Sequence, residues 1–188
     1  MTPKTSALLA DPHPRSHIVF PYTSESLIAE AVSLYSIGGL ARDEAVVLIT
    51  TPEHRDAIEE RLEQDGFSVS QLTAAGRLVL MDAQELLNQF LVDGAPDPAR
   101  FHQLVGGVIE KARHNSPSGK VRLFGEMVSL LYGENLAAAS DLEELWNAAI
   151  DIYSVPLLCT YALDGPEPEA RTAFPKKLLA AHSHQLPV

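Results

Sequence analysis

A carboxylate directly follows an apolar segment in the run Phe124-Gly125-Glu126-Met127. If the apolar segment is a strand of a parallel sheet, Glu126 lies at the carboxyl edge of that sheet, where open α/β folds bind their ligands. A carboxylate at such a position can act as a base, accept a hydrogen bond or bind a metal ion. The alternatives are a solvated loop residue and a charge that favours a helix N-terminus. We expect Glu126 to contact a ligand.

Three more polar side chains stand at the ends of apolar segments. Tyr22 has a ring and a hydroxyl that suit a small amphipathic ligand, although buried tyrosines with one satisfied hydroxyl are common. Asp82 can contact a ligand or, with Glu85 three residues later, form a capping box that opens a helix. Tyr161 ends the last apolar segment. Tyr22, Asp82 and Tyr161 are therefore further candidate ligand-binding residues.

The sequence lacks the common motifs for phosphate, nucleophilic and metal chemistry. The first apolar run leads into PYTSES, which has no glycine for an amide nest and no lysine to bind a phosphate, and no GxSxG motif occurs. His182 and His184 have no cysteine or acidic residue at a recognised ligand spacing, so no metal site is predicted. Cys159 lies within an apolar run, which favours a small core residue over a reactive thiol.

The elements that must position these residues are five short apolar runs separated by helical patterns: residues 17–20, 45–49, 78–81, 121–124 and 155–161. This alternation predicts a three-layer α/β fold, with a mostly parallel sheet and helices on both faces. His17 begins the first strand, opposite the ligand edge, which favours a structural hydrogen bond. We expect Gly38-Gly39 to end a helix, and close packing on another element to explain Gly106-Gly107.

Length and composition limit the function classes. The chain has 188 residues and a formal net charge of −11, which predicts one domain and excludes non-specific binding to nucleic acids or anionic membranes. Residues 1–15 contain three prolines and no periodicity, so we expect a mobile tail before a domain at 16–188. No segment is typical of a signal peptide or a membrane span, and the expected location is cytoplasmic.

Several motifs together resemble the MEDS domain, the methanogen/methylotroph DcmR sensory domain. The resemblance covers about residues 16–188 and rests on the order and spacing of its parts: His17-Ile18-Val19 leading to Tyr22, AVVLITTPEHRDAIEERLEQDG, FGEM, LEELWN, LLCTY and HSHQLP. Two positions depart from the family pattern, because Pro21 replaces an aromatic residue and Thr23 replaces a frequent acidic residue.

This resemblance implies a fold similar to a RecA/KaiC-type core that has lost its phosphate loop. It also implies a sensory module for small hydrocarbon derivatives, in which His17, Tyr22 and Glu126 are the positions to watch. We expect no cofactor. We expect a stand-alone module that passes its signal to a regulatory protein, such as a histidine kinase or an anti-sigma element. A homodimer is the commonest arrangement for such a domain.

Three functions remain open. The leading hypothesis is a non-enzymatic sensor that binds a small, partly apolar molecule, with Glu126 and Tyr22 as polar anchors. The second is a nucleotide-binding or ATP-hydrolysing relative that uses Glu126 or Asp82, which the missing phosphate loop disfavours. The third is a scaffold whose acidic surface binds a basic partner, an interaction that salt would weaken.

Overall fold

A parallel sheet forms the centre of the computed structural model, which describes residues 1–163 and 176–187. Its strand order is β3-β2-β6-β7-β1-β8, and every pairing among the described strands of this sheet is parallel. The strands are β1 (His17–Tyr22), β2 (Ala45–Thr50), β3 (Leu78–Asp82), β6 (Val121–Gly125), β7 (Leu157–Ala162) and β8 (His184–Gln185). A short antiparallel pair, β4 (Leu91–Val92) and β5 (Ala95–Pro96), lies outside it.

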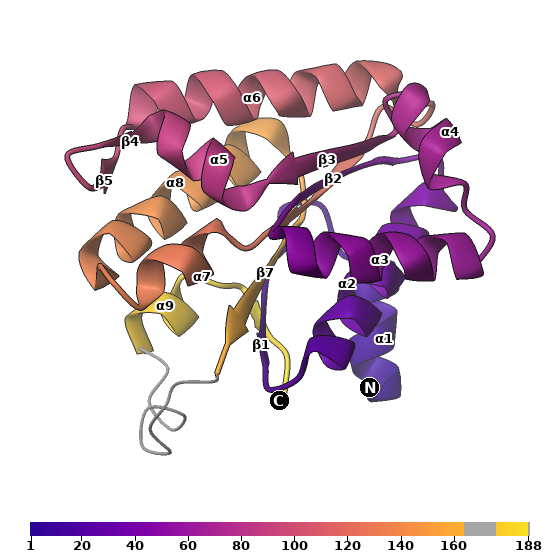
Figure 1. Cartoon of the computed structure of the whole chain (residues 1–188), viewed down its shortest axis with the longest axis horizontal. Coiled ribbons are helices and arrows are strands. Elements are labelled where there is room, and N and C mark those ends of the chain that lie inside the picture. Colours follow the sequence, from indigo (N-terminus) through magenta and orange to yellow (C-terminus); the bar gives the residue numbers. More distant parts are fainter. Residues whose placement is uncertain (164–175, 188) are drawn as a thin grey trace.

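Helices cover both faces of the sheet, so the three-layer α/β prediction is confirmed (Figure 1). The first helical layer consists of α1 (Pro3–Ala10), α2 (Glu25–Leu40), α3 (Pro52–Gln64) and α4 (Val69–Ala74). The second consists of α5 (Ala83–Phe90), α6 (Pro98–Asn115), α7 (Met127–Tyr132), α8 (Leu136–Tyr153) and α9 (Lys176–Ala180). Each layer has its own hydrophobic core, because successive side chains of a strand point to opposite faces.

Strand β1 is longer than the sequence predicts, since it continues through Pro21 to Tyr22. Pro21 pairs with Tyr161 of β7 on one side, whereas β8 on the other side reaches only Ile18 and Val19. A proline is tolerated where one side of a strand lacks a hydrogen-bonding neighbour. Tyr22 therefore ends the strand rather than following it.

The strand order creates a crevice between β2 and β6, which are neighbours in the sheet. The chain leaves β2 into α3 in the first helical layer and leaves β6 into α7 in the second. Neighbouring strands whose chains leave toward opposite faces open a crevice at their carboxyl ends, where open α/β sheets bind ligands. The residues after Thr50 and Gly125 border this crevice.

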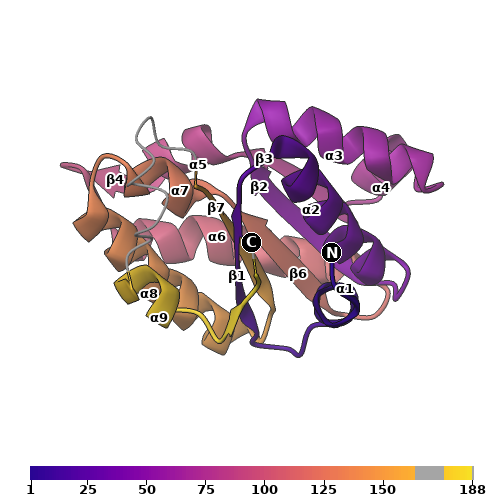
Figure 2. The ribbon, with the colours of Figure 1, turned by 90° about the horizontal axis from the view of Figure 1, so that it is seen from below.

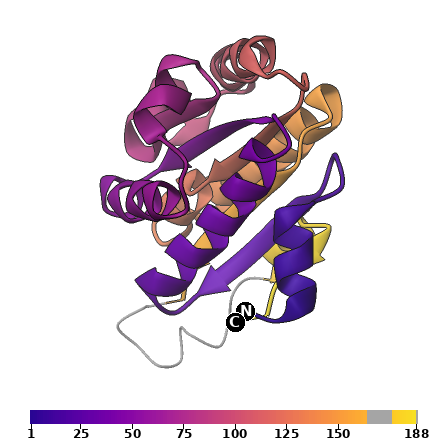
Figure 3. The ribbon, with the colours of Figure 1, turned by 90° about the vertical axis from the view of Figure 1, so that its right-hand side faces the viewer.

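The prediction of a mobile tail at residues 1–15 is wrong for residues 3–10, because these residues form α1. This helix packs on α2 (Figure 3), and its Leu9 is fully buried. Nη1 of the buried Arg122 donates to the carbonyl oxygens of Ala10, at 3.1 Å, and Tyr35, at 3.0 Å. Its Nε donates to Glu44 at 2.5 Å. The buried Arg122 side chain thus holds α1 against the domain through hydrogen bonds. No local sequence pattern indicates this contact.

The glycine pair at 38–39 does not end a helix, because α2 includes both residues and ends at Leu40. A Cβ at Gly38 would lie 2.2 Å from Ala10 O, and one at Gly39 would lie 2.6 Å from two atoms of the Arg122 side chain. The pair therefore allows α1 and Arg122 to approach α2 closely. The packing interpretation holds for Gly106, where a Cβ would lie 2.2 Å from the Tyr153 hydroxyl, but not for Gly107, which is open.

The C-terminal segment lies in two parts against the sheet and the second helical layer. Helix α9 packs beside α8 (Figure 2), and β8 pairs with β1. The sequence also predicts a loop at PEPEA after Gly165 and a short amphipathic stretch at 173–181. The loop and the start of that stretch lie outside the described residues. Among the helices of residues 1–163 and 176–187, none has the length and apolar character needed to cross a membrane.

Candidate functional site

Glu126 lies in the crevice between β2 and β6 and is almost completely buried, with 3% of the residue exposed. Its backbone N–H donates to Ile49 O at 3.1 Å, which holds the end of β6 against the end of β2. The Thr50 hydroxyl donates to Glu126 Oε2 at 2.5 Å, and the Thr51 backbone N–H donates to the same oxygen at 2.8 Å. These hydrogen bonds hold the Glu126 side chain in place at the carboxyl edge.

His54 joins Glu126 to a second carboxylate. Its Nδ1 is hydrogen-bonded to Glu126 Oε1, and its Nε2 to an oxygen of Glu25. The Glu126 hydrogen bond is the main cause that raises the pKa of His54 to about 9, although partial burial acts in the other direction. The imidazole is therefore protonated at neutral pH and donates from both nitrogens.

Tyr22 packs against His54 from the end of β1. Its ring meets the His54 ring edge-on, with centroids 5.8 Å apart and an interplanar angle of 80°. Next to the pair is a hollow of about 420 Å³, lined by Glu25, Thr51, Glu53, His54 and Ala57. Tyr22 and Glu126 both contact His54, which lines this hollow, but neither of these two expected site residues lines it. The hollow is large enough for a small molecule.

The N-terminus of α2 lies at the same edge and carries a negative charge. Glu25 is the first residue of α2, and Ser24 precedes it without a side-chain capping bond. A helix N-terminus attracts anions, but here the Glu25 carboxylate already supplies one. With neither glycine nor lysine in the preceding PYTS segment, this end of α2 is a poor site for a nucleotide phosphate.

Asp82 does not belong to this group of side chains and instead caps a helix. Its Oδ1 accepts a hydrogen bond from the Glu85 backbone N–H at 2.8 Å, at the start of α5. Asp82 is paired with Thr50 in the sheet, at the same carboxyl edge. The Asp82 carboxylate therefore caps α5, as the capping-box interpretation of the sequence predicts.

The other two expected site residues, His17 and Tyr161, lie in a separate buried cluster beneath α8 and α9. Tyr161 donates its hydroxyl proton to Glu143 of α8, and His17 Nδ1 is 2.9 Å from Asn147 Oδ1. Burial lowers the pKa of His17 to about 4 and raises that of Glu143 to about 7. The ring of His182 lies 4.0 Å from that of His17, centroid to centroid. Neither His17 nor Tyr161 lines the hollow beside His54.

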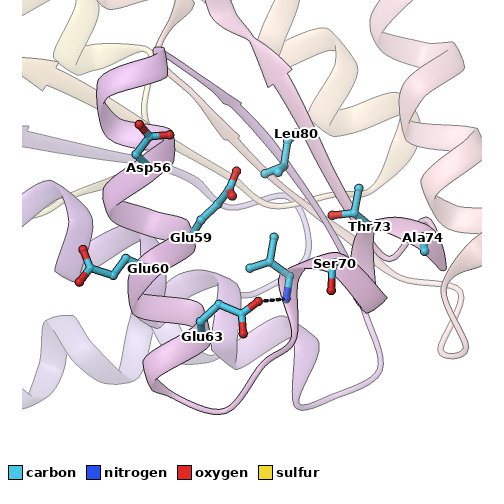
Figure 4. Close-up of a pocket in the computed structure, with 9 residues that line it drawn as sticks. Asp56, Glu59, Glu60, Glu63, Ser70, Thr73, Ala74 and Leu80 are labelled. Atoms are coloured by element: carbon cyan, nitrogen blue, oxygen red, sulfur yellow. Dashed lines mark hydrogen bonds between the residues drawn. The ribbon is translucent and has the colours of Figure 1, made fainter.

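A second hollow, of about 870 Å³, lies between α3, α4 and the edge strand β3 (Figure 4). We call it the acidic groove, because its lining includes Asp56, Glu59, Glu60 and Glu63 of α3 and contains no basic residue. Glu63 also accepts a hydrogen bond from the Val69 backbone N–H at 2.7 Å. None of the expected ligand-binding residues lines the acidic groove.

Sequence reasoning missed His54, Glu25 and Glu143. His54 is three residues after Thr51, which precedes α3, so its side chain points back toward the strand ends as in a capping box. This three-residue spacing from Thr51 is the sequence feature that could have identified His54. Glu25 and Glu143 lie within helical patterns, and nothing local distinguishes them from solvated glutamates.

The comparisons with known proteins concern the fold and the family. A KaiC-like protein of the hyperthermophilic archaeon Pyrococcus horikoshii has a similar fold, with a TM-score of 0.53 and 13% sequence identity. The similarity covers 80% of this chain and 62% of that protein, so this chain spans less than two thirds of its length. No curated protein matches this chain.

The family assignment comes from a sequence model. The model of the MEDS family, described as the methanogen/methylotroph DcmR sensory domain, matches residues 16–182. The matched region includes the carboxyl-edge residues and the buried cluster. The RecA/KaiC-like fold expected from the sequence is confirmed by the structural neighbour. This protein belongs to the MEDS family of sensory domains, which implies a sensory role.

Proposed function

We propose that this protein senses a small, partly apolar molecule that carries an oxygen acceptor, and that it binds this molecule beside His54 and Glu126. The observation that supports this most directly is the hydrogen bonding of His54. Its Nδ1 bond goes to the buried Glu126, whereas its Nε2 bond goes to Glu25, whose side chain is 75% exposed. The outer bond can be exchanged while the inner one is kept.

The ligand oxygen would replace Glu25 as the acceptor of the Nε2–H of His54. His54 and Glu25 both line the hollow of about 420 Å³, and the methyl group of Ala57 supplies apolar surface in its lining. Release of Glu25 would free the first turn of α2 from its link to α3. Ligand binding would in this way change a contact between two helices, which a sensor requires.

We further propose that the signal passes along α3 to a basic segment of a regulatory protein, such as a histidine kinase or an anti-sigma element. Helix α3 carries His54 in its first turn and the carboxylates of the acidic groove over its remaining length. Charge complementarity favours a basic partner. A lysine-rich and arginine-rich partner segment should then bind less tightly as salt increases.

The alternative of a nucleotide-binding or ATP-hydrolysing protein that uses Glu126 is less well supported. Both oxygens of Glu126 already accept hydrogen bonds from Thr50, Thr51 and His54. Glu25 also puts a negative charge at the N-terminus of α2. A phosphate group would therefore meet a carboxylate where nucleotide-binding folds present backbone N–H groups.

A thermal-shift screen tests the proposal. The probes are one-carbon to four-carbon alcohols, aldehydes, ketones and haloalkanes, with ATP and Mg²⁺ in parallel. A compound at about 100 times its Kd stabilises by roughly 2.7 kcal/mol, which raises the Tm by roughly 5–10 °C in a domain of this size. We expect an oxygen-containing organic compound to produce this shift and ATP to produce none.

Matched variants then locate the binding site. His54→Gln and Glu126→Gln should remove the shift, whereas Glu53→Gln should retain it, because Glu53 lines the same hollow but has no bond to His54. A shift with ATP that disappears in Glu126→Gln would instead favour the nucleotide alternative. An organic ligand that binds Glu126→Gln and wild type equally would contradict the proposed site.

A further inference from the structure

Four potential metal ligands meet between the sheet and helices α8 and α9. They come from β1, α8, β7 and the turn after α9, and they are His17, Glu143, Cys159 and His182. One ligand atom of each lies within 4.8 Å of those of the other three, and all four residues are buried. Imidazole nitrogen, carboxylate oxygen and thiolate sulfur are the donor atoms of protein zinc sites.

Three of the separations between these side chains are close to the ligand spacing of a metal site. His17 Nε2 lies 3.3 Å from Cys159 Sγ and 3.3 Å from Glu143 Oε2. His182 Nε2 lies 3.5 Å from the other carboxylate oxygen, Oε1. In a tetrahedral site with zinc–ligand bonds of about 2.0–2.3 Å, neighbouring ligand atoms are about 3.3–3.7 Å apart. The three closest separations fall in this range, and the remaining ones, all within 4.8 Å, must shorten for the four side chains to surround one ion.

Both histidines are held in the orientation that metal binding requires. His17 Nδ1 is 2.9 Å from Asn147 Oδ1, and His182 Nδ1 is 2.8 Å from the Leu178 carbonyl oxygen. Because both partners are acceptors, each Nδ1 carries the proton and each Nε2 presents a lone pair to the cluster. Metal-binding histidines are typically fixed in this way by a hydrogen bond from the other ring nitrogen.

Two polar atoms of the cluster lack hydrogen-bond partners among the described residues. Glu143 Oε2 and His182 Nε2 are buried and have no hydrogen-bond partner among the described residues. Two imidazole lone pairs thus face a carboxylate oxygen and a thiol in a space away from water. Buried polar atoms normally find partners, and each exception needs an explanation such as a missing ion.

We propose that His17, Glu143, Cys159 and His182 bind one zinc ion. Binding releases the thiol proton of Cys159, and any proton on Glu143, so that the thiolate and the carboxylate balance the charge of Zn²⁺. Two neutral imidazoles complete a tetrahedral set with no place left for a substrate, which is typical of structural zinc. The Tyr161 hydroxyl, which donates to Glu143 Oε1, leaves Oε2 available for the ion.

The zinc ion would hold the C-terminal segment to the rest of the domain. Three ligands belong to β1, α8 and β7, while His182 lies between α9 and β8. A hollow of about 230 Å³ between α8 and α9 reaches Glu143 and Asn147 and offers an entry path for the ion. The site shares no residue with the hollow beside His54, so the two proposals stand or fall separately.

The test uses the full chain purified without a polyhistidine tag. After dialysis against metal-free buffer, mass spectrometry should find about one zinc per chain, and removal by a chelator should lower the Tm. Titration of the metal-free protein with Co²⁺ should give a thiolate-to-cobalt charge-transfer band. Cys159→Ser should abolish that band and, like His182→Gln, weaken the affinity by about 100-fold or more, beyond the usual effect of losing a residue that only orients a ligand.

Neighbouring residues of the same type provide controls. Glu144 is exposed and adjacent to Glu143, and His184 is exposed and two residues after His182. Glu144→Gln and His184→Gln should bind zinc like wild type, whereas Glu143→Gln should not. The proposal is overturned if the metal-free wild type binds neither Zn²⁺ nor Co²⁺, or if the cobalt spectrum survives Cys159→Ser. Equal losses of affinity in the control variants would also overturn it.

Discussion

His54 and Glu126 are hydrogen-bonded to each other across the crevice between β2 and β6, although 72 positions separate them in the chain. Glu126 is held by Thr50 and Thr51 at the end of β2, and His54 follows in the first turn of α3. The pair therefore depends on the neighbouring positions of β2 and β6 in the sheet. Its charge, its exposure on one side and its contact with Glu25 make it the centre of the proposed ligand site.

The first prediction concerns the charge of His54. Glu126→Gln removes the carboxylate that does most to raise the pKa of this imidazole. We expect the pKa of His54 to fall from about 9 to within about one unit of the ordinary value of 6.5. An NMR titration of the imidazole resonances measures this value. Glu53→Gln, which removes an exposed charge from the same helix turn, should leave the pKa of His54 almost unchanged.

The second prediction concerns the pH dependence of stability. The pKa of His54 is higher in the folded protein, at about 9, than the unfolded value of 6.5. Its contribution to the free energy of unfolding is therefore complete below about pH 6.5 and is lost as pH rises through about 9. Because solvent screens this partly exposed pair, we expect the free energy of unfolding to lose only about 1–2 kcal/mol of the His54 contribution. Denaturant unfolding at pH 6, 7.5 and 9.5 should show a difference between wild type and His54→Gln that shrinks with pH.

The third prediction compares two glycines inside helices. Gly38→Ala would place a methyl group 2.2 Å from Ala10 O, so that the backbone of α1 must move. We expect a cost of about 1–3 kcal/mol. No atom of the residues that the structure describes lies within 4 Å of the position of a Cβ at Gly107. Gly107→Ala should therefore stabilise by about 0.5–1 kcal/mol, because alanine favours a helix. Equal unfolding free energies for the two variants would contradict the packing of α1 on α2.

The fourth prediction concerns the cation that fastens α1. Arg122→Met leaves Glu44 buried without its partner, which should cost about 3–5 kcal/mol and speed the proteolysis of residues 1–11. Arg42 provides the control, because it also donates to Ala10 O, at 3.0 Å, but its side chain is 45% exposed. Arg42→Met should cost no more than about 1 kcal/mol. Limited proteolysis and denaturant unfolding of both variants distinguish the two contributions.

The sequence by itself determined the fold class and part of the carboxyl edge. The apolar runs and the helical patterns between them predict a parallel sheet covered on both faces, because burial on both faces demands continuous apolar strands. Glu126 and Tyr22 are predicted as site residues because each stands at the end of a strand, a position that local pattern reveals. The cap at Asp82 depends on a residue three positions away and is likewise local.

Only the tertiary structure decided which of these residues meet. The approach of β2 and β6, which joins His54 to Glu126, depends on a strand order that no single segment encodes. The sequence does not predict α1, because the contacts that hold it come from Arg122 and from α2, both distant in the chain, rather than from its own periodicity. Cys159 and His182 share a cluster with His17 for the same reason: close packing of distant elements, rather than spacing along the chain, determines which polar groups are buried together.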